Sequence, residues 1–185
     1  ALKDAVRGDP RGASTITQQL VGNMHPDLVD RRDKSPMRKL REQAAAREME
    51  KHYNKEQILE GYLNQIGFGH GWYGIESASR HYFGKASAQL TLAEAATLAS
   101  LPKGPAIYDP IKAPERVTER RNLVLHRMTE LDFLTQAQLE SALDEPIPTR
   151  NDVQPPQVTT KYPYFTTWVR QQVVDQVGAG KAFEG

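Results

Sequence analysis

The residue types best suited to chemistry stand together at positions 38–42, which read RKLRE. On a helix, Arg38 and Glu42 are four residues apart and therefore project from the same face. Cationic groups such as those of Arg38 and Lys39 clamp a phosphate or pyrophosphate, and a carboxylate beside them handles a proton or balances charge. The plainer interpretation is an exposed ion pair that contributes about 0.3–0.5 kcal/mol. Spacing alone leaves both interpretations open.

A second group of polar side chains precedes this segment. Residues 12–19, GASTITQQ, combine a glycine, three hydroxyl groups and two glutamine amides at the start of a predicted helix. Such groups at a helix start form a natural cradle for an anion or a sugar. The competing interpretation is an ordinary N-cap supplied by Ser14 or Thr15. Two amides and three hydroxyls are many for a cap alone, and both interpretations stay open.

The third candidate is the segment 67–74, GFGHGWYG, which is rich in glycine and aromatic residues. Glycine lets the backbone approach a ligand closely, and aromatic faces stack on sugars. A tight structural turn with buried aromatic rings explains the same residues equally well. His70 has no second His, Asp or Glu at ligand spacing, so the sequence predicts no metal site there. The chain also lacks a P-loop, a dinucleotide-binding fingerprint and a Gly-x-Ser-x-Gly elbow.

The composition is that of a folded domain without a strong charge bias. The 185 residues include 38% hydrophobic and 25% charged side chains, enough for one domain with its own core. A net charge of +1 excludes the global basic field that is typical of nucleic-acid-binding proteins. There are no cysteines, so disulfides play no part in the fold. No run of about 18 apolar residues appears, and the sequence therefore predicts no membrane-spanning helix.

Caps and apolar spacing predict a mainly α domain. Ser35 and Pro36 are the N-cap and first position of a long helix, and Asn54 with Gln57 forms a capping box. Polar residues 24–35 predict a loop. Thr91 with Glu94 and Thr135 with Gln138 begin two later helices, and the stretch 146–163 is an extended connection. Besides the two later helices, the sequence predicts helices at about residues 15–23, 36–52, 55–66, 75–82, 114–131 and 164–177.

Taken in order, these segments resemble the motifs of the family 51 glycosyltransferases, the polymerising domains of class A penicillin-binding proteins. Residues 12–19 resemble the second motif of the family, and residues 38–42 resemble the third. Residues 55–64, KEQILEGYLN, resemble the fourth motif, and residues 80–85, RHYFGK, resemble the fifth. The resemblance covers about residues 8–145 well and the rest more loosely, with four motifs in the right order and spacing.

The resemblance implies a lysozyme-like helical fold with a smaller lobe that faces the membrane. It implies a peptidoglycan glycosyltransferase that transfers a lipid-linked glycan strand to the 4-hydroxyl of lipid II, inverts the anomeric carbon and releases undecaprenyl pyrophosphate. Glu42 matches the second acidic residue of the catalytic site, where it would orient the neighbouring cations instead of acting as the base. The implied substrate-binding residues are Thr15, Gln19, Asn23, Lys34, Arg38 and Lys39, with no metal ligand.

Cofactors, partners and location follow from the resemblance alone. It implies no required cofactor and leaves the participation of a divalent cation open. The implied partners are lipid II, the glycan strand and the membrane surface, at the periplasmic or extracellular face of a bacterial inner membrane, and not nucleic acid. Residues 1–150 would form the glycosyltransferase domain. Residues 151–185 would form a connection and a helix that lead toward a transpeptidase domain.

The sequence departs from the family pattern at three places. The opening Glu-Asp-x-x-Phe-x-x-His motif, which carries the general base, is absent from the 185 residues. Either that segment has been trimmed or this copy cannot deprotonate the acceptor, so the chain by itself is expected to be inactive. Gly22 stands where a lysine is usual, and Lys34 stands where an arginine with a bidentate fork is frequent. Two alternatives stay open: a catalytically silent module that binds lipid-linked glycan or a partner, and a lysozyme-like hydrolase.

Overall fold

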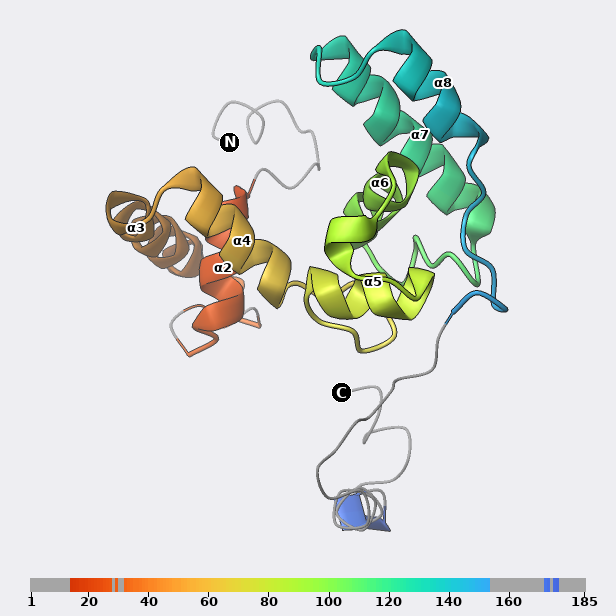
Figure 1. The fold of residues 1–185 in the computed structure, drawn as a ribbon. Helices are drawn as coiled ribbons and strands as arrows, with labels where there is room; N and C mark the ends of the chain where they lie inside the picture. The colour runs from red at the N-terminus through yellow and green to blue at the C-terminus, as the bar shows by residue number, and fades with distance from the viewer. Residues whose placement is uncertain (1–13, 28, 30–31, 154–171, 174, 177–185) are drawn as a thin grey trace. The chain divides into compact units, whose positions relative to one another are not determined.

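Helices account for most of the structure. The computed structural model describes, with gaps, residues 14–27, 29, 32–153, 172–173 and 175–176 (Figure 1). Over these residues the chain has seven α-helices with defined bounds and no strand, so the predicted mainly α class is confirmed. Two compact units divide the chain, Ala1–Ile66 and Gly67–Gly185, where the composition predicts a single domain.

Each described helix of the first unit begins at a cap that the sequence predicts. The described helices of this unit are α2 (Ile16–Met24), α3 (Pro36–His52) and α4 (Lys55–Gln65). Thr15 caps α2 in a capping box with Gln18, and Ser35 caps α3. Asn54 and Gln57 form the capping box of α4. Side-chain oxygens at these positions accept from N–H groups that the first turn leaves unpaired, so short polar residues determine where each helix starts.

Helix α2 is central to the first unit because it packs against both α3 and α4 (Figure 1). Its buried Val21 forms an apolar cluster with Val29 and with Ala46 of α3. On the α4 side, Gly61 permits a close approach, since a Cβ at that position would lie 3.3 Å from Leu20 Cδ2. Two neighbours therefore hold the α2 backbone, and the polar residues at its start have a defined position.

The described part of the second unit contains four α-helices and two short 3-10 helices. Their bounds are α5 (Ile75–Phe83), η1 (Ser87–Gln89), α6 (Leu92–Ser100), η2 (Leu101–Lys103), α7 (Pro114–Glu130) and α8 (Gln136–Asp144). The predicted capping boxes of Thr91 with Glu94 and of Thr135 with Gln138 begin α6 and α8. The sequence does not predict η1 or η2, because a single turn of three residues has no periodic pattern to reveal it.

Helices α6, α7 and α8 pack together over a core of small and aliphatic side chains. The buried members of this core are Ala93, Ala96, Leu125, Leu139 and Ala142. Arg121 of α7 is also buried, at 2% exposure. Its guanidinium donates to the carbonyl of Leu143 at 3.0 Å and to the carbonyl of Glu145. Because the last turn of a helix leaves carbonyls without partners, Arg121 completes the end of α8 and joins it to α7.

Some sequence-based predictions fall outside the described residues. Gly12 and Ala13 of the second motif lie outside them, as does most of the helix predicted over 164–177, although residues 172–173 and 175–176 are helical. The division into a domain and a connection at residue 150 stays a prediction. Within the described ranges, no helix is both long enough and apolar enough to cross a membrane.

Replacing Arg121 with methionine is expected to lower the free energy of unfolding by about 2–3 kcal/mol, because carbonyls at the end of α8 lose their donor. Chemical denaturation followed by circular dichroism measures this change. The control is Arg127→Met, which removes an arginine of the same helix whose side chain is 66% exposed. That substitution should cost less than about 0.5 kcal/mol. Equal losses in the two variants would contradict the role given to Arg121.

Candidate functional site

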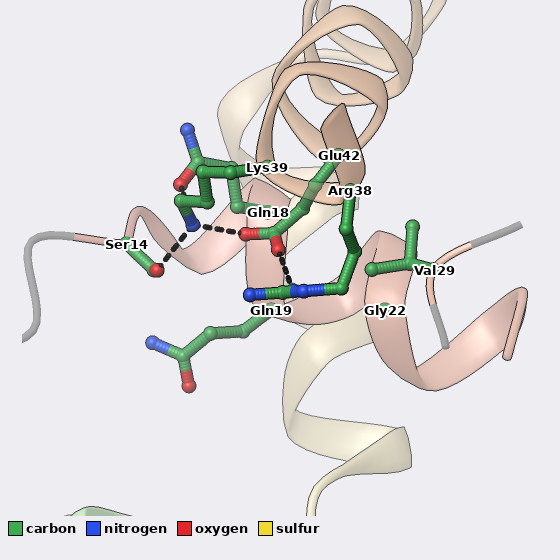
Figure 2. Close-up of a pocket in the computed structure, with 8 residues that line it drawn as sticks. All are labelled: Ser14, Gln18, Gln19, Gly22, Val29, Arg38, Lys39 and Glu42. Atoms are coloured by element: carbon green, nitrogen blue, oxygen red, sulfur yellow. Dashed lines mark hydrogen bonds and ion pairs between the residues drawn. The ribbon is translucent and has the colours of Figure 1, made fainter. Parts of the chain in front are cut away.

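Glu42 of α3 is the buried acid at the centre of a charged cluster. The residue is only 6% exposed, and both of its carboxylate oxygens have cationic partners. Oε2 lies 2.8 Å from Arg38 Nη1, and Oε1 makes a close ion pair with Lys39 Nζ (Figure 2). Burial of a charge is costly unless it is paired, and this pairing meets that requirement. One carboxylate faces two cations, so the cluster keeps an excess of positive charge.

Lys39 connects this cluster to the start of α2. Its Nζ donates to Ser14 Oγ at 2.7 Å and to Gln18 Oε1 at 3.1 Å, in addition to its contact with Glu42 (Figure 2). An ammonium group has three protons, and these three acceptors account for them. The contacts join residues that are 25 and 21 positions apart in the sequence. The segment resembling the third motif is therefore bonded directly to the segment resembling the second.

A cavity of about 410 Å³ lies beside the cluster. The residues that line it are Ser14, Gln18, Gln19, Gly22, Val29, Arg38, Lys39 and Glu42 (Figure 2). Arg38 Nε is buried and has no hydrogen-bond partner among the described residues. Because an unmet buried donor costs about 1–3 kcal/mol, a ligand oxygen that reached this group would be favoured. The size of the cavity and its cationic and amide lining suit an oxygen-rich anion such as a phosphate or diphosphate.

A local hydrogen-bond network holds the beginning of α3, on which Arg38 lies. Ser35 Oγ accepts from the Arg38 N–H at 3.3 Å, and Asp33 accepts from the Ser35 N–H at 2.8 Å and from its hydroxyl at 2.9 Å. These two bonds lower the pKa of Asp33, and the bond from the Ser35 backbone has the larger effect. The positive charge of the nearby Arg41 also lowers this pKa. The stabilisation is present above the ordinary pKa of the carboxyl and is lost as the pH falls through the lowered value. The start of α3 is thus held throughout the neutral range.

Gln19 is positioned by a residue of the fourth motif. The hydroxyl of Tyr62, a largely buried residue of α4, donates to Gln19 Oε1 at 3.3 Å. Burial raises the pKa of Tyr62, so its hydroxyl keeps its proton and remains a donor. The segment resembling the fourth motif therefore supports the wall of the cavity through α4, which packs against α2.

The structure brings four of the predicted site residues to one cavity. They are Gln19, Arg38, Lys39 and Glu42. Ser14 and Gln18 belong to the segment that resembles the second motif, but neither is among the predicted site residues. Both residues accept hydrogen bonds from Lys39, which lies more than twenty positions away in the sequence. Residue spacing within a motif cannot reveal such a long-range contact.

The three other predicted binding residues do not line this cavity. Thr15 accepts from the Gln18 N–H with its hydroxyl and serves as the N-cap of α2, the alternative that the sequence left open. Asn23 is half-buried near the end of α2, and Lys34 is exposed in the loop that precedes α3. Contact of these residues with a substrate stays a prediction.

The segment 67–74 belongs to the second unit and lines a different cavity. His70, which the sequence excludes as a metal ligand for want of partners, has one carboxylate neighbour, Asp109. In the part of the chain that the structure describes, no group of three or more His, Asp or Glu side chains is arranged to hold a metal ion. Participation of a divalent cation in a reaction stays a prediction.

Comparison with known proteins decides the family. A family model described as transglycosylase matches residues 1–129, well over half of the chain. The chain belongs to the transglycosylase family. This is the glycosyltransferase domain of class A penicillin-binding proteins, as the motifs of the sequence implied.

Similar proteins agree with this transglycosylase assignment. Penicillin-binding protein 1A of Aquifex aeolicus is 42% identical over 171 residues, which cover 91% of this chain and 22% of that protein. The protein of the same name in Pseudomonas aeruginosa is 40% identical over 174 residues, covering 94% and 20%. The crystal structure of penicillin-binding protein 1A from Haemophilus influenzae matches with a TM-score of 0.54 and 38% identity, over 71% of this chain and 19% of that one. The chain spans about a fifth of the length of these relatives.

Binding of inorganic pyrophosphate to the 185-residue chain tests the chemistry of the cavity. Arg38→Lys is expected to weaken binding by about tenfold, because lysine keeps the charge but loses the planar fork that grips two oxygens. Isothermal titration calorimetry measures the affinity. The control is Arg47→Lys, an exposed arginine nine positions along α3 and so on its opposite face, which should bind as the unmodified chain does. Unchanged affinity in Arg38→Lys would contradict an anion site at this cavity.

Proposed function

We propose that this transglycosylase domain polymerises lipid II into the glycan strands of peptidoglycan and releases undecaprenyl pyrophosphate. The observation that carries the proposal is the cluster of Arg38, Lys39 and Glu42, which borders a cavity and has more positive than negative groups. A departing diphosphate gains negative charge and needs fixed cations close by. Membership of the transglycosylase family supports the same reaction class.

The reaction exchanges one bond at a sugar carbon. The 4-hydroxyl oxygen of lipid II attacks the anomeric carbon of the lipid-linked strand from the face opposite the diphosphate, so the configuration inverts. The bond from this carbon to the diphosphate oxygen breaks, and its electron pair leaves with undecaprenyl pyrophosphate. The hydroxyl proton passes to a general base, which the family resemblance places in the first motif. That motif is absent from these 185 residues.

The residues of the cluster have distinct roles in this proposal. Arg38 and Lys39 stabilise the charge that develops on the diphosphate, and Lys39 is held ready by Ser14 and Gln18 before any ligand arrives. Glu42 orients both cations. Since each of its oxygens already faces a cation, we assign Glu42 this orienting role and not that of the base.

The proposal extends to the membrane. We infer that the first unit is the smaller lobe of a lysozyme-like fold and faces the outer surface of a bacterial inner membrane. Its support is the exposure of Met24, Met37 and Leu40, at 48%, 60% and 57%, since exposed apolar side chains favour contact with lipid or with a partner. The greater length of the relatives agrees with a bifunctional parent protein that carries a transpeptidase domain downstream.

One observation favours a second candidate function. Gly22 lines the cavity at the place where the resemblance expects a lysine, which removes one contact to phosphate. A module with this weakness could grip lipid-linked glycan without polymerising it. Consumption of lipid II separates the two candidates, and glycan chains that grow in length exclude a hydrolase.

In a parent protein that carries the first motif, Glu42→Gln and Arg38→Ala are each expected to lower the rate of polymerisation by at least about tenfold, because the leaving group loses an oriented cation. Gel analysis of glycan strands made from labelled lipid II measures the rate, and circular dichroism verifies the fold. The matched control is Glu48→Gln, an exposed acid of the same helix, which should polymerise normally. Normal chain growth in both site variants would refute the assignment.

Gly22→Lys is expected to strengthen pyrophosphate binding by about tenfold, because it adds a cation to the wall of the cavity. Gly22→Ala is the control, since both substitutions raise helix propensity by about 1 kcal/mol but only lysine adds charge. Titration of the 185-residue chain with pyrophosphate compares the three proteins. If Gly22→Ala and Gly22→Lys bind pyrophosphate with the same affinity, a missing charge at position 22 does not limit binding at this cavity.

A further inference from the structure

The second unit has a cavity that the proposed reaction does not use. Its volume is about 750 Å³. It is lined by the glycine-rich turn, residues 67–73, and by residues of the segment 105–112. Ligand-binding pockets typically have roughly 300–1,000 Å³ and combine aromatic walls with a few convergent polar groups. Its walls include Trp72, Tyr73, His70 and Asp109, which match that description.

The glycine-rich turn is held in one conformation. The Phe68 N–H donates to the Trp72 carbonyl at 2.8 Å, and the Trp72 N–H donates to the Gly69 carbonyl at 2.9 Å. The buried hydroxyl of Tyr82 donates to the Phe68 carbonyl at 2.8 Å, and Phe68 itself is 1% exposed. A turn fixed in this way offers a preformed surface, which lowers the entropy that a ligand must lose on binding.

His70 sits at the tip of this turn in an unfavourable backbone conformation. Its φ of 53° is positive, and so are those of Gly69 at 93° and Gly71 at 76°, although only glycine adopts such angles without cost. A non-glycine residue kept in this region costs about 1–3 kcal/mol, and such strain gathers at functional sites. In this conformation, His70 Nε2 lies 3.2 Å from Asp109 Oδ2.

Asp109 determines which ring nitrogen of His70 faces a ligand. The carboxylate is 5% exposed, and its other oxygen accepts from the backbone N–H of Ile111 at 2.9 Å, so Asp109 is a fixed acceptor. Because Nε2 of His70 faces Asp109, its other ring nitrogen, Nδ1, is left to hydrogen-bond to a hydroxyl of the ligand. A buried carboxylate in the wall disfavours an anion, and the one lysine that lines the cavity, Lys112, is 76% exposed.

Aromatic faces provide the remaining wall. Tyr73 is 65% exposed, so its ring face is accessible to a ligand. Trp72 stacks on His81 with ring centroids 4.7 Å apart and at 27°, which fixes its indole ring. Rigid aromatic side chains beside a hydrogen-bonding histidine suit a sugar ring, whose C–H face is apolar and whose rim carries hydroxyls.

We propose that this cavity binds the uncharged sugar rings of an oligosaccharide of β-linked N-acetylated amino sugars, with Tyr73 stacking on one ring and His70 Nδ1 hydrogen-bonding to a hydroxyl. The identity of the sugar rests on the proposed function, since a glycan strand of this chemistry is the polymer that the domain would make. The cavity then holds part of the strand during elongation.

Titration of the 185-residue chain with tetra-N-acetylchitotetraose, followed by saturation-transfer NMR on its acetyl methyl groups, tests this proposal. Tyr73→Ala should weaken binding by at least about tenfold, whereas Tyr73→Phe, which keeps the aromatic face, should stay within about twofold. The matched control is Phe133→Ala, an aromatic residue of the second unit that is 72% exposed and does not line the cavity. It should leave binding unchanged.

A second variant tests the histidine. His70→Asn keeps a residue that tolerates positive φ but removes the imidazole, so binding should again fall by about tenfold. Absence of binding in the unmodified chain, or wild-type binding in both Tyr73→Ala and His70→Asn, would overturn the proposal. Chitotetraose binding requires no catalysis. Retained binding by a parent protein that fails to polymerise lipid II therefore refutes the proposed function alone, and polymerisation without chitotetraose binding refutes this inference alone.

Discussion

The ion pairs of Glu42 are the contact on which the polar arrangement of the first unit depends. Without this carboxylate, Arg38 and Lys39 would be two like charges on adjacent positions of one helix, partly removed from water and repelling each other. With it, both side chains converge on one point. Lys39 is then close enough to reach Ser14 and Gln18 on the neighbouring helix. A single buried acid thereby connects the geometry of two segments that the sequence separates by a loop.

Helix α3 shows how strongly the fold and the candidate site share their contacts. Of its 17 residues only Glu42 and Ala46 are buried, which is a small apolar contribution for a helix of this length. Polar bonds provide much of its attachment to α2, among them the 2.6 Å hydrogen bond from Thr17 to Glu50. Such bonds are directional, so they specify the rotation of α3 as well as its position. The interactions that dock the helix are the same ones that aim its cations at the cavity.

Local rules predicted the helices well, because at several of them the cap is a contact between residues three positions apart. Asn54 with Gln57 and Thr135 with Gln138 begin their helices as expected, and the mainly α class follows from such signals. The site was predicted less completely. A hydroxyl such as that of Thr15 serves a cap and a ligand equally well in the sequence, and only the coordinates show that it caps α2. Ser14 and Gln18 depend on a contact across the loop, for which spacing carries no information.

The two oxygens of Glu42 also have a consequence for turnover in the proposed reaction. They occupy the cations in the resting protein, in the manner of a built-in counter-ion, so an incoming diphosphate must compete with a carboxylate for the same groups. The net free energy of binding is therefore the attraction of the cations for the diphosphate minus their attraction for Glu42. When the product departs, the carboxylate is already beside Arg38 and Lys39 and restores their pairing at once. In the proposed polymerisation, an internal competitor of this kind would allow a grip that is firm during bond cleavage and easily released afterwards.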